Sequence, residues 1–201
     1  MEIKRICNIY FSPTGTTQKV VTTIGDCLAA SFETDRLDYD FTLPEARRDF
    51  PLLEETDLVV FGCPTYAGRL PNLLLKYLDT IAGNGARAIP IVTFGSRAFD
   101  NSLIELQDLL ETHGFHTIAA AAFSCEHSFS DTLGAGRPDA ADLEDAENFA
   151  FAVSGELIKS AAFHQPIASV KVDGDLQAGY YQPRDRHGVF IDIRKVKPLT
   201  S

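Results

Sequence analysis

The 201-residue chain has no tryptophan, one methionine and only four cysteines. The cysteines, Cys7, Cys27, Cys63 and Cys125, include no C-x-x-C pair, which excludes an iron–sulfur or zinc cluster built from neighbouring cysteines. Their spacing is also unlike that of a disulfide-rich secreted domain. Residues 1–10 hold no signal-peptide core, and no apolar run approaches the ~20 residues that a membrane helix needs. We therefore expect a cytoplasmic protein without a membrane segment.

Positive charge is also scarce. The chain has 18 Lys and Arg residues against 28 Asp and Glu residues, which gives a formal net charge of −10. A nucleic-acid-binding domain needs a basic surface, so this composition argues against a nucleic-acid partner and against docking on anionic lipid. The hydrophobic fraction of 45% and the charged fraction of 23% are ordinary for a globular protein and exclude extensive disorder.

Apolar strand-like runs alternate with helix-like segments along the chain. The expected strands are residues 6–11, 36–41, 58–61, 88–94 and 115–123, and the expected helices are residues 16–31, 70–81, 103–112 and 139–163. Residues 42–55, with two prolines and many charges, are expected to form a loop or one short turn. This order predicts an α/β fold, a doubly wound five-stranded parallel sheet covered on both faces. Such sheets bind ligands at the carboxyl ends of their strands. Pro90 removes one donor from the fourth strand.

Residues 164–201 have a different character. They contain three prolines and two short alternating segments, residues 170–172 and 189–193, with no helix between them. This pattern is typical of an extended arm or a small β addition rather than a second domain. We therefore expect one domain over residues 1–163, followed by a C-terminal arm or linker.

The strongest local signal is the sequence Ser-Pro-Thr-Gly-Thr-Thr at residues 12–17, between the first expected strand and the first expected helix. Four of its six residues carry hydroxyls, and a helix N-terminus adds unpaired N–H groups and a positive dipole. Together they can enclose a terminal phosphate without Lys or Arg. The segment is neither Gly-Lys-Ser/Thr nor Gly-x-Gly-x-x-Gly, which excludes the nucleotide sites that those motifs mark. A plain helix cap is the simpler alternative, but a cap needs only one hydroxyl.

The form Ser/Thr-x-Thr-Gly-x-Thr occurs in the phosphate loop of flavodoxins, and residues 12–17 resemble it at each defined position. Four further blocks, residues 62–71 (GCPTYAGRLP), 95–99 (GSRAF), 126–130 (EHSFS) and 136–139 (GRPD), resemble the flavodoxin part of ferredoxin-fused flavodoxins, or ferrodoxins. The resemblance implies FMN as cofactor, the strand order 2-1-3-4-5 and electron transfer. It also implies a ferredoxin-type iron–sulfur module, fused or separate, or another redox protein as partner.

The chain departs from the fused group at three points. Its helix between the second and third strands is reduced to residues 42–55, and Ser96 stands where relatives often carry Asn. The fused group continues into cluster-binding cysteines after a segment like residues 194–198 (RKVKP), whereas this sequence ends at Ser201. We therefore expect either a longer native gene product or a separate ferredoxin.

The resemblance places the cofactor in three loops that follow strands. The expected cofactor-binding residues are Ser12, Thr14, Gly15, Thr16 and Thr17 in the first loop, Pro64, Thr65, Tyr66, Ala67, Gly68 and Arg69 in the second, and Thr93, Phe94, Gly95, Arg97 and Phe99 in the third. We expect Tyr66 to stack on the flavin and Arg69 to face its N1–C2=O edge or a substrate anion. The simpler alternative leaves Tyr66 a packing role and Arg69 a solvated charge. No catalytic side chain and no metal ligand are expected, because the chemistry belongs to the flavin.

Two other functions stay open at this point. An NAD(P)H-dependent flavin or quinone reductase is compatible with the same fold and loops. Cys63 and Arg69 also have the C-x5-R spacing of a phosphatase nucleophile and its phosphate-binding arginine. Leu70 opposes the phosphatase alternative, because Ser or Thr usually assists the leaving thiolate at that place. Residues 12–17 are also the better phosphate site.

Overall fold

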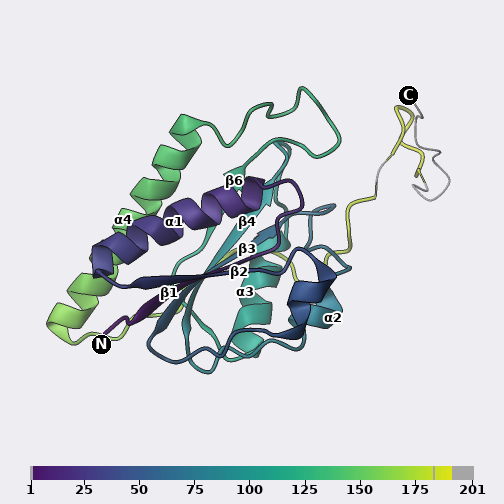
Figure 1. Cartoon of the computed structure of the whole chain (residues 1–201). Helices are drawn as coiled ribbons and strands as arrows, with labels where there is room; N and C mark the ends of the chain where they lie inside the picture. Colours follow the sequence, from purple (N-terminus) through teal and green to yellow (C-terminus); the bar gives the residue numbers. More distant parts are fainter. Residues whose placement is uncertain (1, 183, 192–201) are drawn as a thin grey trace.

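A parallel sheet covered by helices on both faces forms the centre of the protein (Figure 1). The structure, a computed structural model, describes residues 2–182 and 184–191. Its strands are β1 (Arg5–Tyr10), β2 (Asp35–Asp40), β3 (Asp57–Pro64), β4 (Arg87–Phe94), β5 (His116–Thr117) and β6 (Ala121–Ser124). Its helices are α1 (Thr16–Phe32), the 3₁₀ turn η1 (Pro44–Arg48), α2 (Leu75–Leu78), α3 (Ser102–Thr112) and α4 (Ala140–Phe163). The strand order β2-β1-β3-β4-β5, with β6 paired to β4, confirms the predicted doubly wound sheet.

The two faces of the sheet bury separate apolar clusters. Side chains of β1 alternate between them: Ile6 and Tyr10 face α1 and α4, whereas Cys7 and Ile9 face α2 and α3. The central strands β3 and β4 are buried along almost their whole length, which explains their continuous apolar sequences. The edge strand β2 alternates between half-buried and exposed residues, and its sequence pattern is correspondingly weak.

Three of the expected helices, α1, α3 and α4, are confirmed, and η1 confirms the single short turn expected between the second and third strands. The start of α4 shows why the sequence signal was clear. The Asp139 side chain accepts from the N–H groups of Ala141 (2.9 Å) and Asp142 (3.1 Å), and the Asp142 carboxylate accepts from the Asp139 N–H (2.9 Å). This reciprocal capping box ends the preceding loop and begins the helix.

The helix expected over residues 70–81 is wrong in extent. Only Leu75–Leu78 is helical, and the chain before it folds through tight turns, in one of which the Leu74 N–H donates to the Pro71 carbonyl at 2.9 Å. The buried residues of this segment are Leu70, Pro71, Leu74, Leu78 and Ile81. The four-residue spacing of the buried leucines is what an α-helix would produce, but a succession of turns also buries them, because apolar spacing indicates which side chains pack inward without specifying the hydrogen bonding.

The fifth expected strand, residues 115–123, is divided into β5 and β6. The Ala88 carbonyl of β4 accepts from the Ile118 N–H at 3.0 Å. Alternate residues of a strand bond to the same neighbour, so the next β4 residue that faces this neighbour is Pro90. Proline has no N–H to donate, and the ladder breaks there. The register against β4 then shifts by one residue between β5 and β6.

The C-terminal arm follows the β5 edge of the sheet after α4 ends. The Val170 N–H donates to the Thr117 carbonyl of β5 at 2.9 Å, and Val172 packs against the cluster beneath α2 and α3. Further on, the Asp175 N–H donates to the Asn101 side chain at 2.8 Å, beside the start of α3. The arm thus crosses from the amino ends of the strands to their carboxyl ends.

The arm contains less strand than its sequence predicts. Residues 170–172 make a single ladder-like hydrogen bond and form no strand, which contradicts the expectation. In the other alternating segment, Phe190 forms an isolated bridge with Arg184, and residues 192–193 lie outside the described residues. The division of the chain into a domain and an arm stays a prediction.

Candidate cofactor site

The N-cap residue of α1 is a glycine and offers no side-chain acceptor to the first N–H groups of the helix. Gly15 occupies the N-cap position with φ 82°, a left-handed conformation that favours glycine, and nothing lies within 4 Å of the place that a Cβ would take. In the described part of the chain, no hydrogen-bond partner is found for the N–H groups of Thr16 and Thr17. These donors and the positive end of the helix dipole remain available for an anion.

The four hydroxyls of this loop have different surroundings. Ser12 Oγ accepts from the third N–H of α1 at 2.9 Å, so this hydroxyl supports the helix start. Thr17 Oγ1 lies 2.7 Å from Thr93 Oγ1, and both residues are buried. Thr14 Oγ1 and Thr16 Oγ1 lie 3.3 Å apart on the exposed side of the loop. Thr14 and Thr16 are therefore the hydroxyls that an incoming phosphate would meet first.

The β3–α2 loop contains a tight turn over residues 66–69. The Tyr66 N–H donates to the Arg69 carbonyl at 2.8 Å, and the Arg69 N–H donates to the Tyr66 carbonyl at 3.1 Å. The central residues Ala67 and Gly68 have φ values of 49° and 81°, as a type I′ turn requires. A Cβ on Gly68 would lie 2.7 Å from Asp100 Oδ2, so glycine allows this turn to touch the β4–α3 loop.

Arg69 is held inside the protein. Its Nε and Nη2 donate to the two carboxylate oxygens of Glu105 at 3.0 and 2.8 Å, and Glu105 also accepts from the Leu70 N–H at 2.7 Å. Its Nη1 donates to the carbonyls of Leu176 (3.3 Å) and Ala178 in the arm. The hydrogen bond to Glu105 raises the pKa of the Arg69 guanidinium. A solvated Arg69 is therefore wrong, and its contact with a flavin or anion stays a prediction.

The β4–α3 loop presents aromatic and charged side chains at the same edge. The rings of Phe94 and Phe99 pack with centroids 5.6 Å apart. Arg97 forms an ion pair with Asp100, and its guanidinium carbon lies 4.7 Å from the centre of the Tyr181 ring. An exposed cation–π contact of this kind contributes about 0.5–1 kcal/mol.

Thr93 connects the three loops. Besides its bond to the Thr17 hydroxyl, its carbonyl accepts from the Thr65 N–H at 2.7 Å. The Thr65 hydroxyl in turn lies 2.7 Å from Ser102 Oγ at the start of α3. The structure therefore brings the expected first, second and third loops to one edge of the sheet, at the carboxyl ends of β1, β3 and β4.

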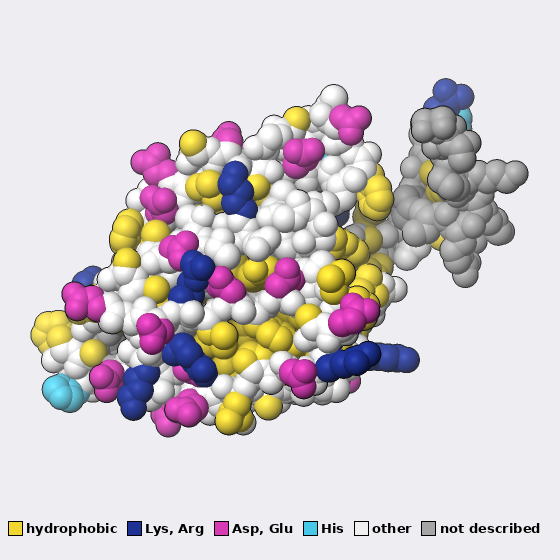
Figure 2. Space-filling view, viewed as in Figure 1, with side chains coloured by type: hydrophobic (Ala, Val, Ile, Leu, Met, Phe, Trp, Pro, Cys, Tyr) yellow, Lys and Arg dark blue, Asp and Glu magenta, His cyan; other side chains and the backbone are white. Residues whose placement is uncertain are grey.

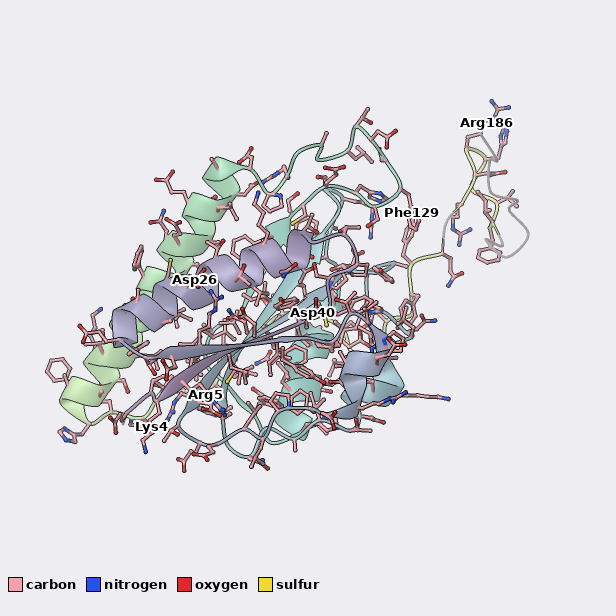
Figure 3. The ribbon with its side chains drawn as sticks, viewed as in Figure 1. Lys4, Arg5, Asp26, Asp40, Phe129 and Arg186 are labelled. Carbon is pink, nitrogen blue, oxygen red and sulfur yellow. The ribbon has the colours of Figure 1, made fainter. Side chains whose placement is uncertain are left out.

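Sequence reasoning left Phe129 out of the site. Phe129 belongs to the loop after β6 and projects into solvent with 95% of its surface exposed (Figure 3). The same loop reaches the expected site, because a Cβ on Gly95 would lie 2.8 Å from His127 Cα. The sequence signal for this loop is its pair of aromatic side chains, His127 and Phe129, which follow the last expected strand.

Sequence reasoning also missed two tyrosines of the arm. The Tyr181 N–H donates to the Ala67 carbonyl at 2.6 Å, and the Tyr180 hydroxyl donates to the Leu70 carbonyl at 2.8 Å. Consecutive tyrosines in an otherwise polar arm were the available signal. Nothing local in the sequence specified their partners more than 100 positions earlier.

The C-x5-R phosphatase alternative is wrong. Cys63 is 0% exposed and packs in the cluster beneath α2 and α3, and this burial raises the pKa of its thiol. A nucleophilic cysteine must be accessible and must ionise readily. Arg69, the second residue of the motif, is occupied by Glu105.

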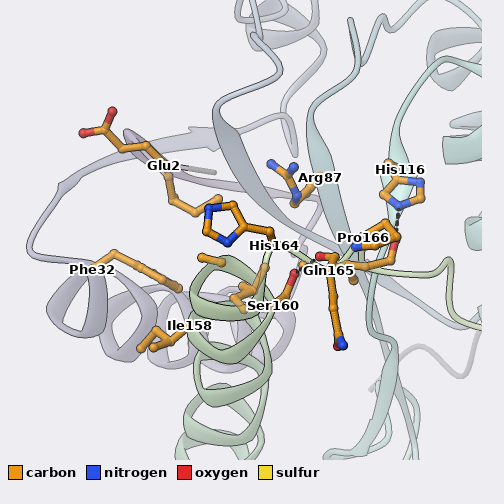
Figure 4. Close-up of a pocket in the computed structure, with 13 residues that line it drawn as sticks. Glu2, Phe32, Arg87, His116, Ile158, Ser160, His164, Gln165 and Pro166 are labelled. Carbon is orange, nitrogen blue, oxygen red and sulfur yellow. Dashed lines mark hydrogen bonds between the residues drawn. The ribbon is translucent and has the colours of Figure 1, made fainter.

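A separate hollow lies at the amino ends of the strands, opposite the candidate site (Figure 4). Arg87 and His116, the first residues of β4 and β5, line it together with the end of α4. His116 Nε2 lies 3.0 Å from the Ile167 carbonyl on its wall. The length of β4 separates it from the Phe94 end by roughly 23 Å, so it is not part of the candidate site.

Three further properties of the described residues bear on function. None of their helices combines the length and the apolar composition that crossing a bilayer requires. Within residues 2–182 and 184–191, no three His, Cys, Asp or Glu side chains gather as a metal-binding group. On the face shown in Figure 2, acidic and basic side chains are interspersed and form no basic patch.

Solved structures share this architecture. Flavodoxin 2 from Bacillus cereus matches with a TM-score of 0.55 and 17% identity over 76% of this chain and 99% of its own. The chain has the flavodoxin fold. A flavodoxin from the domain Archaea matches with a TM-score of 0.52 and 12% identity, over 77% of this chain and 99% of its own. The apo form of the NADH:FMN oxidoreductase EMOB matches the same fold with a TM-score of 0.52 and 18% identity, over 76% of this chain and 89% of its own.

Sequence comparison adds one relative to these flavodoxin-fold structures. It is an uncharacterized protein of Methanocaldococcus jannaschii, 28% identical over 141 residues, which cover 67% of this chain and 87% of that protein. No protein-family model matches the chain.

Proposed function

We propose that this protein binds FMN at the carboxyl edge of its sheet and carries electrons between redox partners. The observation that carries the proposal is the start of α1, where Gly15 leaves open space and the Thr16 and Thr17 N–H groups have no partner among the described residues. That arrangement suits a terminal phosphate. The shared fold with flavodoxins and with an NADH:FMN oxidoreductase supports the same cofactor.

Each loop has a distinct task in this proposal. The Thr14 and Thr16 hydroxyls and the first N–H groups of α1 hold the phosphate. Tyr66 and the backbone of the two later loops hold the ring system and exclude water from part of it. Bound FMN supplies the electron-transfer chemistry, and the protein tunes it through the charges and donors near the ring.

FMN is favoured over FAD because the chain offers one phosphate site. Residues 12–17 fit a single terminal phosphate, and the sequence contains no Gly-x-Gly-x-x-Gly motif for a pyrophosphate. The adenylate half of FAD would need a second binding surface. We therefore expect a one-to-one complex with FMN.

The visible absorption spectrum of the purified full chain tests this proposal. Flavin bands are expected, and flavin released by heat should run as FMN on chromatography. If the protein is purified without flavin, calorimetric titration with FMN replaces the spectrum. Released FAD, or no flavin binding in either experiment, would overturn the proposal.

A ferredoxin-type iron–sulfur module, fused or separate, is the proposed partner. The arm supports this partner, because it leads the chain past the candidate cofactor loops before residue 182. Anaerobic mixing of the reduced protein with a ferredoxin should bleach the ferredoxin spectrum at a rate that depends on both concentrations.

An NAD(P)H-dependent flavin or quinone reductase is the second candidate. The fold shared with the NADH:FMN oxidoreductase favours it. Steady-state oxidation of NADPH or NADH by the FMN-loaded protein, with free FMN or a quinone as acceptor, distinguishes the two. A carrier shows no turnover above free FMN, whereas a reductase does.

A further inference from the structure

We propose that residues 176–181 of the arm form a strap that holds the β3–α2 loop and the β4–α3 loop, here called the flavin loops, in their binding conformation. This inference rests on the proposed FMN site, and it assigns to the arm a positioning role in that site. The strap lies more than 70 residues after either loop in the chain, yet its contacts converge on both of them.

Hydrogen bonds fasten the strap to the β3–α2 loop. The Tyr181 N–H donates to the Ala67 carbonyl at 2.6 Å, and the Tyr180 hydroxyl donates to the Leu70 carbonyl at 2.8 Å. In the opposite direction, Arg69 donates to the carbonyls of Leu176 (3.3 Å) and Ala178. Arg69 is also clasped by Glu105 of α3, with side chains only 13% exposed on each partner. A bidentate pair shielded in this way has a defined geometry, so α3, the loop and the strap are joined at one guanidinium.

A ring contact fastens the strap to the β4–α3 loop. The Tyr181 ring lies under the Arg97 guanidinium at 4.7 Å. Arg97 in turn pairs with Asp100, whose carboxylate lies beside Gly68 of the β3–α2 loop. Tyr181 therefore touches both loops, with its backbone on one and its ring on the other.

The β3–α2 loop needs such support. Ala67 adopts a φ of 49°, which is unfavourable for a residue with a Cβ. An isolated turn of this sequence would relax toward other conformations, and strained backbone persists where surrounding contacts hold it. The strap supplies one such contact at the Ala67 carbonyl itself.

The strap therefore affects FMN binding through the population of the competent loop. When a site is competent only a fraction of the time, the apparent dissociation constant rises by the inverse of that fraction. Removing the Tyr180 hydroxyl bond and the Tyr181 ring contact together is expected to raise the FMN dissociation constant about three- to tenfold.

The test compares the variant Tyr180→Phe/Tyr181→Ala with Phe190→Ala as the matched control. Phe190 is a half-exposed aromatic residue of the same arm whose only described backbone bridge is to Arg184. Hydrogen exchange of the flavin-free protein should show faster exchange at the Tyr66 and Arg69 amides in the double variant and no change in the control. FMN titration should show weaker binding in the same variant alone, and circular dichroism checks that both variants remain folded.

The outcomes separate the strap from the proposed function. Unchanged exchange and unchanged FMN affinity in the double variant would overturn the strap while leaving an FMN site in place. Wild-type protein that binds no FMN would overturn the proposed function. The exchange rates at the 66–69 turn would still decide whether the arm holds that loop.

Discussion

At the residue scale, the hydroxyls of the β1–α1 loop should respond differently to removal. Thr14 lies on the exposed side of the loop, where a phosphate would approach, whereas Thr17 is buried against Thr93. A hydroxyl that meets the ligand affects binding, and a hydroxyl that joins two buried elements affects folding. The two substitutions therefore separate the site from its scaffold.

Thr14→Ala should weaken FMN binding by about 1.5–3 kcal/mol, the contribution of one hydrogen bond to a charged phosphate. The free energy of unfolding should stay within ~0.5 kcal/mol of the wild type, because the residue is exposed. Fluorescence titration with FMN and urea denaturation measure the two quantities. Thr22→Ala, at a half-buried threonine on α1 whose hydroxyl bonds to its own helix, is the control. Equal affinity in all three proteins would contradict the loop assignment.

Thr17→Ala should lower the free energy of unfolding by about 1–3 kcal/mol, because it leaves the buried Thr93 hydroxyl without its partner. Urea denaturation of the flavin-free protein measures this effect. Thr93→Ala and the double variant complete a cycle, and the loss in the double variant should be smaller than the sum of the single losses. Additive losses would show that the two hydroxyls do not interact.

Cysteine reactivity tests the exclusion of a phosphatase at the same scale. Burial raises the pKa of Cys63, and it raises the pKa of Cys7 and Cys125 to about 12, so little thiolate forms at pH 8. Burial also raises the pKa of Cys27, but this thiol is only half-buried, so it alone is expected to react with a disulfide reagent in the folded protein. All four thiols should react in denaturant, and Cys27→Ser should abolish the native reaction. Rapid labelling of Cys63 at pH 8 would reopen the nucleophile.

At the scale of elements, the cap of α4 gives a pH-dependent prediction. Hydrogen bonding from Arg137, and then from the Asp139 backbone, lowers the pKa of Asp142 despite its burial. A lowered folded-state pKa means that the carboxylate stabilises the fold above the unfolded-state pKa near 3.9 and that this stability is lost as the pH falls through the folded-state value.

Asp142→Asn should therefore lower the free energy of unfolding by about 1 kcal/mol at pH 7, the usual contribution of a helix cap. The difference from the wild type should shrink as the pH falls below about 4. Urea denaturation at pH 7 and pH 3 measures both values. Asp145→Asn, an exposed change on the same helix, is the control. A difference that persists undiminished at pH 3 would contradict the charged role of Asp142.

The same scale shows which elements the sequence can predict. Runs such as residues 58–61 are buried on both faces, and their composition alone indicates a central strand. In residues 70–81 the apolar side chains are buried as their spacing predicts, but only Leu75–Leu78 is helical. Apolar spacing predicts burial and does not specify the hydrogen bonding of the backbone. Pro90 predicts a weak point in the hydrogen bonding of β4. The break it causes lies in the pairing of β4 with its neighbour, which is divided into β5 and β6.

At the scale of the whole molecule, the sheet assembles the site and the arm completes it. The motif at residues 12–17 and the loops after β3 and β4 could be placed at one edge from strand order alone. The contacts of Arg69 with Ala178 and of Tyr181 with Ala67 could not, because they join segments more than 100 positions apart. Long-range contacts of this kind depend on the path of the folded chain rather than on any local pattern.

Charge distribution over the whole molecule predicts a low reduction potential for bound FMN. Reduction adds negative charge to a protein with a formal net charge of −10. The two arginines of the flavin loops are already paired, Arg69 with Glu105 and Arg97 with Asp100, so neither offers an uncompensated positive charge. The potential for the second electron should therefore lie below that of free FMN, which a spectroscopic redox titration measures.

Two substitutions should move that potential in opposite directions. Arg69→Ala leaves the Glu105 charge unpaired and should lower it, whereas Asp100→Asn releases Arg97 and should raise it. A unit charge about 8 Å away at an effective dielectric constant of about 40 contributes on the order of 1 kcal/mol, or about 40 mV for one electron. Asp35→Asn removes one negative charge, as Asp100→Asn does, but at the amino end of β2, far from the proposed cofactor site. It should shift the potential far less. An unchanged potential in Arg69→Ala would show that the Arg69–Glu105 pair lies too far from the ring to tune it, and an upward shift would contradict the predicted charge effect.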